Sequence, residues 1–226
     1  MKLTKPYEYK ILERITHESG HRVYKVDGSR GLPSVTTILS AMKSKESTEA
    51  LATWRKNVGE KEATRVVELS CSMGNDMHDN LEQHILTEGK AKHKGVMLAK
   101  MMTKLVIKNG LSKVDEVWGT EAQLYYPELY AGTTDLVGIH EGEEAIMDFK
   151  NSRKEKKEEW IEDYKYQLCA YALAHNKAYG TNIKKGVIMM ATHNMVYQEF
   201  VLEGEEFEKY TQLWLNKVYD YYKTHP

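Results

Sequence analysis

The sequence predicts an α/β protein in which a central mixed β-sheet is flanked by helices and preceded by a mainly helical part. Two observations predict this class. Up to about residue 110 the apolar residues recur mostly at helical spacing, and after Gly110 short apolar runs bounded by turn residues take over. From there the predicted order is three strands, a helix, two strands and a helix, which is typical of a layered α/β core. We expect one domain over residues 1–226, with the mainly helical N-terminal part at 1–110 and the α/β core at 111–226.

The N-terminal part is predicted to begin with a hairpin and to continue with four helices. The predicted segments are a hairpin at 7–15 and 21–26, a short helix that ends at 39, and helices at 46–58, 60–87 and 94–109. Ser34 is a good N-cap for the short helix. Gly74 could break the long helix, because glycine is a poor helix former. The last helix is expected to bury an apolar stripe that consists of Val96, Met97, Met101, Leu105 and Val106.

The C-terminal part alternates strands with helices. The predicted segments are strands at 114–126, 130–140 and 143–150, a helix at 160–179, a hairpin at 184–191 and 195–202, and a helix at 207–222. Gly180 follows the first of these helices and is a typical C-cap residue. The last helix carries an apolar stripe at helical spacing, Phe207, Tyr210, Trp214, Val218 and Tyr221, which we expect to pack into the core.

The hairpin between residues 130 and 150 is the most informative stretch. Glu141-Gly142 lies between two apolar runs, and glycine at the second loop position supplies the positive φ of a tight turn. A two-residue loop at this pair places Asp135 directly opposite Asp148, whereas a three-residue loop would shift the register by one residue. Like charges opposed across a sheet are destabilising. A bound divalent cation is the usual reason for such a pair.

Lys150 lies two residues after Asp148 and therefore points to the same face of the strand, while Phe149 points to the other face and into a core. Two aspartates and a lysine on one face suit metal-assisted phosphodiester cleavage. The alternative is a solvated hairpin face with ordinary surface charges. The apolar residues around Asp148 favour a partly buried strand instead.

Five further residues could contribute to a site, and each also has a structural interpretation. His78 and Glu82 are four apart on one helical face, and such a spacing on its own is usually a surface pair. Gln167 and Tyr171 are four apart on the helix after the hairpin and could simply pack on the sheet. Ser152 begins a polar, lysine-rich segment at the exit of the hairpin, where it could contact phosphate or lie in a solvated loop.

Composition limits the classes of function. The net charge of −1 excludes binding of nucleic acid by bulk charge, so any such binding needs a local patch. Two cysteines, Cys71 and Cys169, suit a reduced intracellular protein and cannot supply the four ligands of an iron–sulfur cluster. No signal peptide or membrane span is apparent, so we expect a cytoplasmic protein without membrane contact. No nucleotide-binding loop is present, so any motor would be a separate protein.

The motifs together resemble the PD-(D/E)XK nuclease superfamily. Gly132-Thr-Thr-Asp135, Asp148-Phe-Lys150 and Gln167-x-x-x-Tyr171 match its RecB-like exonuclease branch in order and spacing. Within that branch the chain is most similar to the mitochondrial genome maintenance exonuclease group and its phage relatives. That similarity also covers Pro33 to Leu39, a helix with Trp54, and the Gly74-x-x-x-His78 motif.

The resemblance implies a Mg²⁺- or Mn²⁺-dependent exonuclease of replication, recombination or repair that prefers single-stranded DNA with free ends and works beside separate replication or recombination proteins. It implies metal ligation by Asp135, Asp148, the Phe149 carbonyl and His78, with Lys150 also catalytic. It assigns Ser152, Gln167 and Tyr171 to DNA, and leaves open whether Glu82 and Glu121 take part. The compact length suits a phage or bacterial member without an iron–sulfur cluster. The alternatives are a flap or junction endonuclease and a non-catalytic DNA-binding protein.

Overall fold

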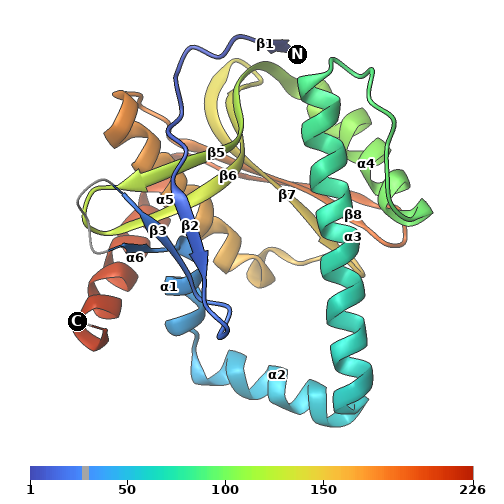
Figure 1. Ribbon diagram of the computed structural model, residues 1–226, viewed down its shortest axis with the longest axis vertical. Coiled ribbons are helices and arrows are strands. Elements are labelled where there is room, and N and C mark those ends of the chain that lie inside the picture. Colours follow the sequence, from blue (N-terminus) through green and yellow to red (C-terminus); the bar gives the residue numbers. More distant parts are fainter. Residues whose placement is uncertain (27–30, 226) are drawn as a thin grey trace.

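A computed structural model describes residues 1–26 and 31–225, and its centre is a six-stranded mixed sheet (Figure 1). The strand order is β1-β5-β6-β7-β8-β9. The strands are β1 (Lys2–Leu3), β5 (Val114–Tyr126), β6 (Tyr130–His140), β7 (Glu143–Ser152), β8 (Lys185–Thr192) and β9 (Tyr197–Leu202). The pairs β1–β5 and β7–β8 are parallel and the other pairs are antiparallel. This is the predicted mixed sheet.

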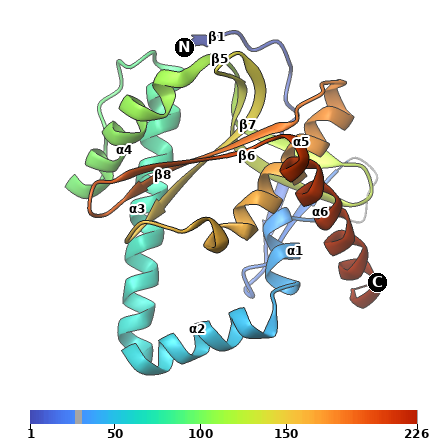
Figure 2. The ribbon, with the colours of Figure 1, turned by 180° about the vertical axis from the view of Figure 1, so that it is seen from behind.

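The N-terminal part combines a small sheet with four helices. The strands β2 (Glu13–Thr16), β3 (Arg22–Lys25) and β4 (Leu32–Pro33) form a three-stranded antiparallel sheet. The helices are α1 (Val35–Ala41), α2 (Lys45–Val58), α3 (Glu60–Leu86) and α4 (Met97–Asn109), and a 3-10 turn (Leu111–Lys113) leads into β5. Ser34 caps α1 by accepting a hydrogen bond from the backbone N–H of Thr37, as predicted. The helix α2 and the first half of α3 extend beyond the sheet (Figures 1 and 2).

The predicted turn and register of the β6–β7 hairpin are confirmed. Glu141 and Gly142 have φ values of 49° and 83°, which are the two positive values of a two-residue hairpin turn. The pairs run from His140 with Glu143 to Leu136 with Met147. The regular pairing ends there, one residue before Asp135 and Asp148, and this interruption shapes the site described below.

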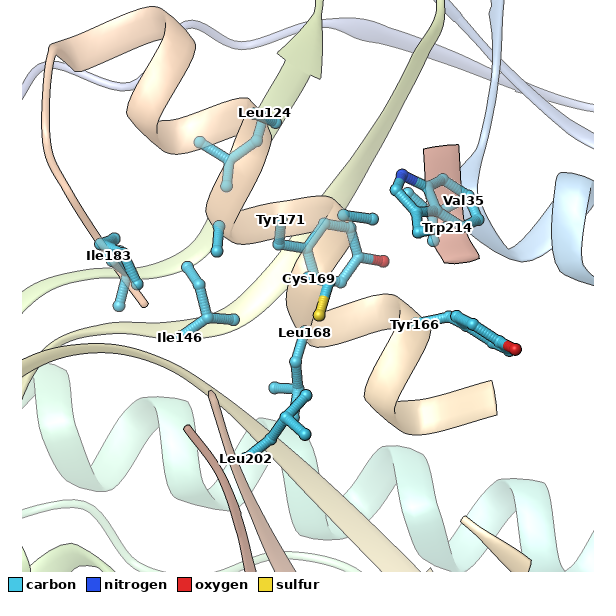
Figure 3. Packing of buried hydrophobic residues seen from close by; sticks show 14 of the residues in the cluster. Val35, Leu124, Ile146, Tyr166, Leu168, Cys169, Tyr171, Ile183, Leu202 and Trp214 are labelled. Carbon is cyan, nitrogen blue, oxygen red and sulfur yellow. The ribbon is translucent and has the colours of Figure 1, made fainter. Parts of the chain in front are cut away.

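Two apolar layers cover the two faces of the sheet. One face packs against α1, α5 (Glu162–Tyr179) and α6 (Gly204–Thr224), and Figure 3 shows Leu168, Cys169 and Trp214 in this layer. The other face packs against α3 and α4 and includes Phe149. The stripe predicted for α6 is confirmed as core packing, because Phe207, Trp214 and Val218 are buried. Within the described residues, no helix combines the length and apolar character needed to cross a bilayer.

Three local expectations are wrong in whole or in part. The strand predicted at 7–15 is only Glu13–Thr16, and residues 7–12 are not in a strand. Gly74 does not break α3, which is continuous from Glu60 to Leu86. Of the stripe predicted for α4, Val106 is buried as expected, but Met97 is 70% exposed and Met101 is 42% exposed. The buried residues of α4 are Ala99, Met102, Thr103 and Val106. Small and polar residues let α4 approach α3, where Asn80 Nδ2 lies 3.5 Å from Thr103 Oγ1, and a stripe chosen by hydrophobicity alone misses that face.

Candidate active site

Three acidic residues lie side by side on three neighbouring strands. Glu121 in β5 lies between the pairs Thr120 with Leu136 and Ala122 with Thr134, which places it across from Asp135 in β6. On the other side of β6, the register places Asp148 of β7 across from Asp135. Glu121 has a φ of 46°, in the left-handed region that non-glycine residues rarely adopt. Backbone of this kind is costly and is concentrated at functional sites.

The Asp135 carboxylate takes the place of a backbone partner. The N–H of Phe149 donates to Asp135 Oδ2 at 2.7 Å, where the ladder between β6 and β7 has ended. In an extended strand the N–H and C=O of one residue point to the same edge. The Phe149 carbonyl therefore also points toward the Asp135 side, beyond the last regular pair of the two strands.

His78 reaches this row of acids from α3. Its Nδ1 lies 3.4 Å from Asp135 Oδ1, and its ring meets the ring of Phe149 edge to face. Gly74 makes this approach possible, because a Cβ there would lie 2.9 Å from Oδ1 of Asn151 in β7. Asn151 also donates to the Ser70 carbonyl of α3 at 3.1 Å. The glycine of the Gly74-x-x-x-His78 motif thus brings the helix close enough to β7 for the histidine to reach Asp135.

Lys150 is held between Asp148 and an aromatic ring. Its ammonium forms an ion pair with Asp148 Oδ2 and lies 5.0 Å from the centre of the Tyr164 ring in α5. A cation over an aromatic face is stabilised by the ring quadrupole. Tyr164 therefore orients the lysine, a role that the sequence analysis did not assign to it although the residue lies on the same side of α5 as Gln167.

Gln167 and Tyr171 of α5 line the cleft, and Ser152 does not. A Cβ at Gly132 would lie 2.6 Å from Tyr171 Cε1, so the glycine at the start of β6 leaves room for this tyrosine. Gln167 Oε1 is buried and has no hydrogen-bond partner among the described residues. Ser152 is buried outside the cleft, and its hydroxyl donates to the Lys154 carbonyl at 2.7 Å. A DNA contact by Ser152 stays a prediction.

Burial and mutual charge shift the ionisation of these groups. Burial disfavours the charge on His78, but Asp135 outweighs it and raises the histidine pKa to about 9. Burial also opposes ionisation of Asp135, yet His78 and Lys150 hold the pKa of that carboxyl below its usual value. Asp148 is affected in the opposite direction: burial, with repulsion by Asp135, raises its pKa to about 6 despite Lys150. The four groups therefore form one coupled cluster.

The cluster lies in a cleft of about 610 Å³. Its walls come from β2, β3, α1, α3, β5, β6, β7 and α5, and they include Glu82 and Glu121 in addition to the residues above. Burial, with repulsion by Asp135, raises the pKa of Glu121 to about 7, although the residue keeps an exposed surface. Glu121 therefore belongs to the row of acidic residues, whereas the sequence alone left open whether it takes part. Arg14, Arg22 and Tyr24 also line the cleft, and no motif in the sequence singles them out.

The residues present fit a divalent cation. One ligand atom each from His78, Glu121 and Asp135 can be chosen so that all three lie within 4.8 Å of one another. Asp148 is not part of this group, although it lines the same cleft. Carboxylate and carbonyl oxygens with one imidazole suit Mg²⁺ or Mn²⁺. The raised pKa values of Asp148 and Glu121 describe an acidic cluster whose repulsion a cation would relieve.

The fold and the order of these residues along the chain are typical of one class of protein fold. A mixed sheet with Asp135 and the Asp148-Phe149-Lys150 strand side by side, and with a Gln-x-x-x-Tyr helix against them, is the core of the PD-(D/E)XK nuclease fold. The chain is similar to mitochondrial genome maintenance exonuclease 1 of Homo sapiens, with 26% identity over 205 residues. This similarity confirms the resemblance drawn from the motifs.

The match covers 84% of this chain and 58% of the human protein, so the chain spans a little over half of that relative's length. Among solved structures, a protein of Eubacterium rectale assigned as an exonuclease has a TM-score of 0.45 at 12% identity, covering 66% of this chain and 63% of that one. No family model matches the sequence.

Proposed function

We propose that the chain is a divalent-metal-dependent DNA exonuclease that hydrolyses phosphodiester bonds and prefers single strands with free ends. The observation that carries this proposal is the convergence of Asp135, Asp148 and Lys150 in one cleft, with His78 against Asp135. The name of the human relative supports DNA as the substrate and strand ends as the place of attack. The same proposal includes a role in replication, recombination or repair, beside separate proteins of those processes; the relative's name supports only genome maintenance.

The metal would be held by Asp135, Asp148, the Phe149 carbonyl and His78, with Glu121 beside them. When bound, a Mg²⁺ or Mn²⁺ ion supplies a water molecule of lowered pKa and polarises the phosphate. Lys150 donates to an oxygen of the scissile phosphate and offsets the charge that builds up there in the transition state. Asp148 keeps the lysine protonated, since the pKa of Lys150 is raised by that carboxylate against the effect of burial. The ring of Tyr164 orients the Lys150 ammonium.

The helix α5 would position the substrate beside Lys150. Gln167 Oε1 is an acceptor left without a protein partner, which suits a bound water or a base N–H. Tyr171 lies against Gly132 with its ring next to the strand that carries Asp135. Both side chains line the cleft, so a strand that reaches the metal passes them.

The test is cleavage of end-labelled linear single-stranded DNA, linear duplex DNA and circular single-stranded DNA, each with Mg²⁺, Mn²⁺ or EDTA. The Asp148→Asn variant is the control, because it keeps the shape of the side chain and removes its charge. We expect metal-dependent loss of the linear single strand, no cutting of circles, and no activity in the variant. The label then reports the direction of attack.

Four results would overturn parts of this proposal. Cutting of circular single strands would replace the exonuclease by an endonuclease at the same site. Full activity of Asp148→Asn, or equal activity in EDTA, would remove the assigned site altogether. A protein that binds DNA but cuts none of the substrates would be the non-catalytic alternative.

A further inference from the structure

The hairpin β2–β3 carries two arginines that face the cleft. Arg14 lies directly across from Tyr24 in the antiparallel pairing, and Arg22 lies two residues before Tyr24 in the same strand. Opposed residues and residues two apart share one face of a sheet, so all three side chains point the same way. All three line the cleft that holds the acidic cluster.

The hairpin that carries the arginines is anchored by Tyr24 and by the backbone of Arg22. Tyr24 is 2% exposed, and its hydroxyl lies 3.1 Å from Oγ1 of Thr133, two residues before Asp135. The backbone of Arg22 is bonded on both sides: its N–H donates to Thr37 Oγ1 at 2.9 Å, and its carbonyl accepts from the Ser34 N–H at 2.8 Å. The backbone of the hairpin is therefore anchored beside the strand that carries Asp135.

The charged side chains on the two faces of the hairpin differ in whether they have a partner of opposite charge. On the outer face Lys25 pairs with Glu13 at 3.0 Å. On the cleft face neither Arg14 nor Arg22 has a carboxylate partner among the described residues, and both are exposed. The two arginines are diagonal neighbours, about 7–8 Å apart at their backbones, so they repel each other unless an anion lies between them. Two neighbouring arginines without carboxylate partners in the described part of the chain are unfavourable, so their place beside the acidic cluster indicates a function.

A polyanion would otherwise meet mainly acidic groups in this cleft. Asp79, Glu82 and Glu121 line it together with the two aspartates, and they repel phosphates that lie away from the metal. The guanidinium fork fits phosphate oxygens with two parallel hydrogen bonds. We infer that Arg14 and Arg22 form a phosphate-binding clamp that holds the sugar-phosphate backbone next to the scissile bond. This inference rests on the proposed function for the identity of the strand.

The clamp explains why a chain with a net charge of −1 can hold DNA. Because arginine contacts to phosphate carry no base information, the binding is independent of sequence. It is also sensitive to salt, since each phosphate contact on a single strand contributes about 0.7 to the slope of log affinity against log salt concentration.

The test measures binding separately from cleavage. Fluorescein-labelled oligothymidylate is titrated with the full-length protein in EDTA, over a series of salt concentrations, and anisotropy gives the Kd. The variants are Arg14→Gln, Arg22→Gln, the double variant, and the double lysine variant. Lys25→Gln is the matched control, because it removes one positive charge from the outer face of the same hairpin. Circular dichroism and thermal unfolding check that each variant folds.

We expect the double glutamine variant to raise the Kd on the order of tenfold and to lower the salt slope by about 1.4, which is two contacts. The lysine variant should keep part of the slope, because charge remains while the fork is lost. Under cleavage conditions the KM should rise and kcat should change little. Wild-type Kd and slope in the double variant, or an equal effect of Lys25→Gln, would overturn the clamp. If the double variant does not fold, the single variants decide by the same criteria.

The outcome is distinguishable from failure of the proposed function. A wild-type protein that binds single strands through the arginines but cuts no substrate would retain the clamp and remove the exonuclease. A protein that cuts normally in all variants would retain the exonuclease and remove the clamp. Absence of any binding by the wild-type protein would overturn the clamp as well.

Discussion

The backbone N–H of Phe149 donates to the carboxylate of Asp135 at 2.7 Å, across the gap where β6 and β7 stop pairing. The register places Asp135 and Asp148, two residues of like charge, opposite each other just beyond the last regular pair. The interruption turns the Asp135 carboxylate into an acceptor for the next strand and leaves the Phe149 carbonyl on the same edge. The acid that we assign to the metal is thus also a structural partner of the strand that carries the other ligands.

Replacement of Asp135 should separate these two roles. Asp135→Asn keeps an acceptor for the Phe149 N–H, whereas Asp135→Ala leaves that buried donor unpaired, which costs about 1–3 kcal/mol. Both variants should lose cleavage, and only the alanine variant should lose that much stability in urea unfolding with EDTA. Equal loss of stability in both would show that the hydrogen bond to Phe149 is not what Asp135 contributes to the fold.

Glu121→Gln should stabilise the metal-free protein at high pH and not at low pH. The pKa of Glu121 is raised from 4.5 to about 7, so its folded state binds the proton more tightly and is favoured below 4.5. That stability is lost as the pH rises through 7, and a neutral glutamine does not lose it. Because Glu121 keeps an exposed surface, we expect a gain of only about 1 kcal/mol above pH 7. Urea unfolding in EDTA on both sides of this range measures it, and a gain that is constant with pH would contradict the assignment.

Metal binding should release a proton from His78. Its pKa of about 9 in the metal-free protein means that it is charged at neutral pH, and a ligating imidazole must be neutral. Between the pKa of Glu121, about 7, and that of His78, the affinity for Mn²⁺ should rise by up to about tenfold per pH unit. Calorimetry in buffers of different ionisation enthalpy counts the protons. His78→Asn should abolish this pH dependence, and an unchanged proton count in that variant would exclude His78 as a ligand.

Tyr164 should act on catalysis through its ring and not through its hydroxyl. The Lys150 ammonium lies 5.0 Å from the ring centre, and such a contact contributes about 0.5–2 kcal/mol. Tyr164→Leu should therefore lower kcat by roughly 2- to 30-fold, since 1.4 kcal/mol corresponds to tenfold. Tyr164→Phe keeps the ring and is the matched control. A phenylalanine variant as slow as the leucine variant would assign the effect to the hydroxyl.

Gly132→Ala should destabilise the fold because the added methyl group would clash with the ring of Tyr171. The added Cβ would lie 2.6 Å from Tyr171 Cε1, and overpacking of this kind costs about 1–3 kcal/mol. Truncation of the ring in Tyr171→Ala removes the clash, so in a double-mutant cycle the cost of Gly132→Ala should fall in that background. Urea unfolding of the four proteins measures the coupling. Additive effects would show that the glycine is needed for another reason.

Local sequence determined much of the architecture of this protein. The Glu141-Gly142 turn and the alternation on either side of it were enough to predict the register of β6 and β7, because a two-residue loop allows only one pairing. Local sequence also predicted the face to which Lys150 points, the cap at Ser34 and the end of α5 at Gly180. Gly180 adopts the left-handed conformation. These features depend on residues that are neighbours in the chain.

Tertiary structure decided what meets in the cleft. His78 and Arg22 lie far from Asp135 in sequence, and only the packing of α3 and of the β2–β3 hairpin against β6 and β7 brings them to it. The left-handed backbone of Glu121 and the end of the β6–β7 ladder lie where three acids occupy adjacent strands, an arrangement that no single segment encodes. The sequence by itself determined which side of each strand the acids occupy, because side chains alternate. Contacts between distant segments decided which cationic side chains lie near the acids. Local sequence patterns carry no information about how far apart such segments lie in the folded chain.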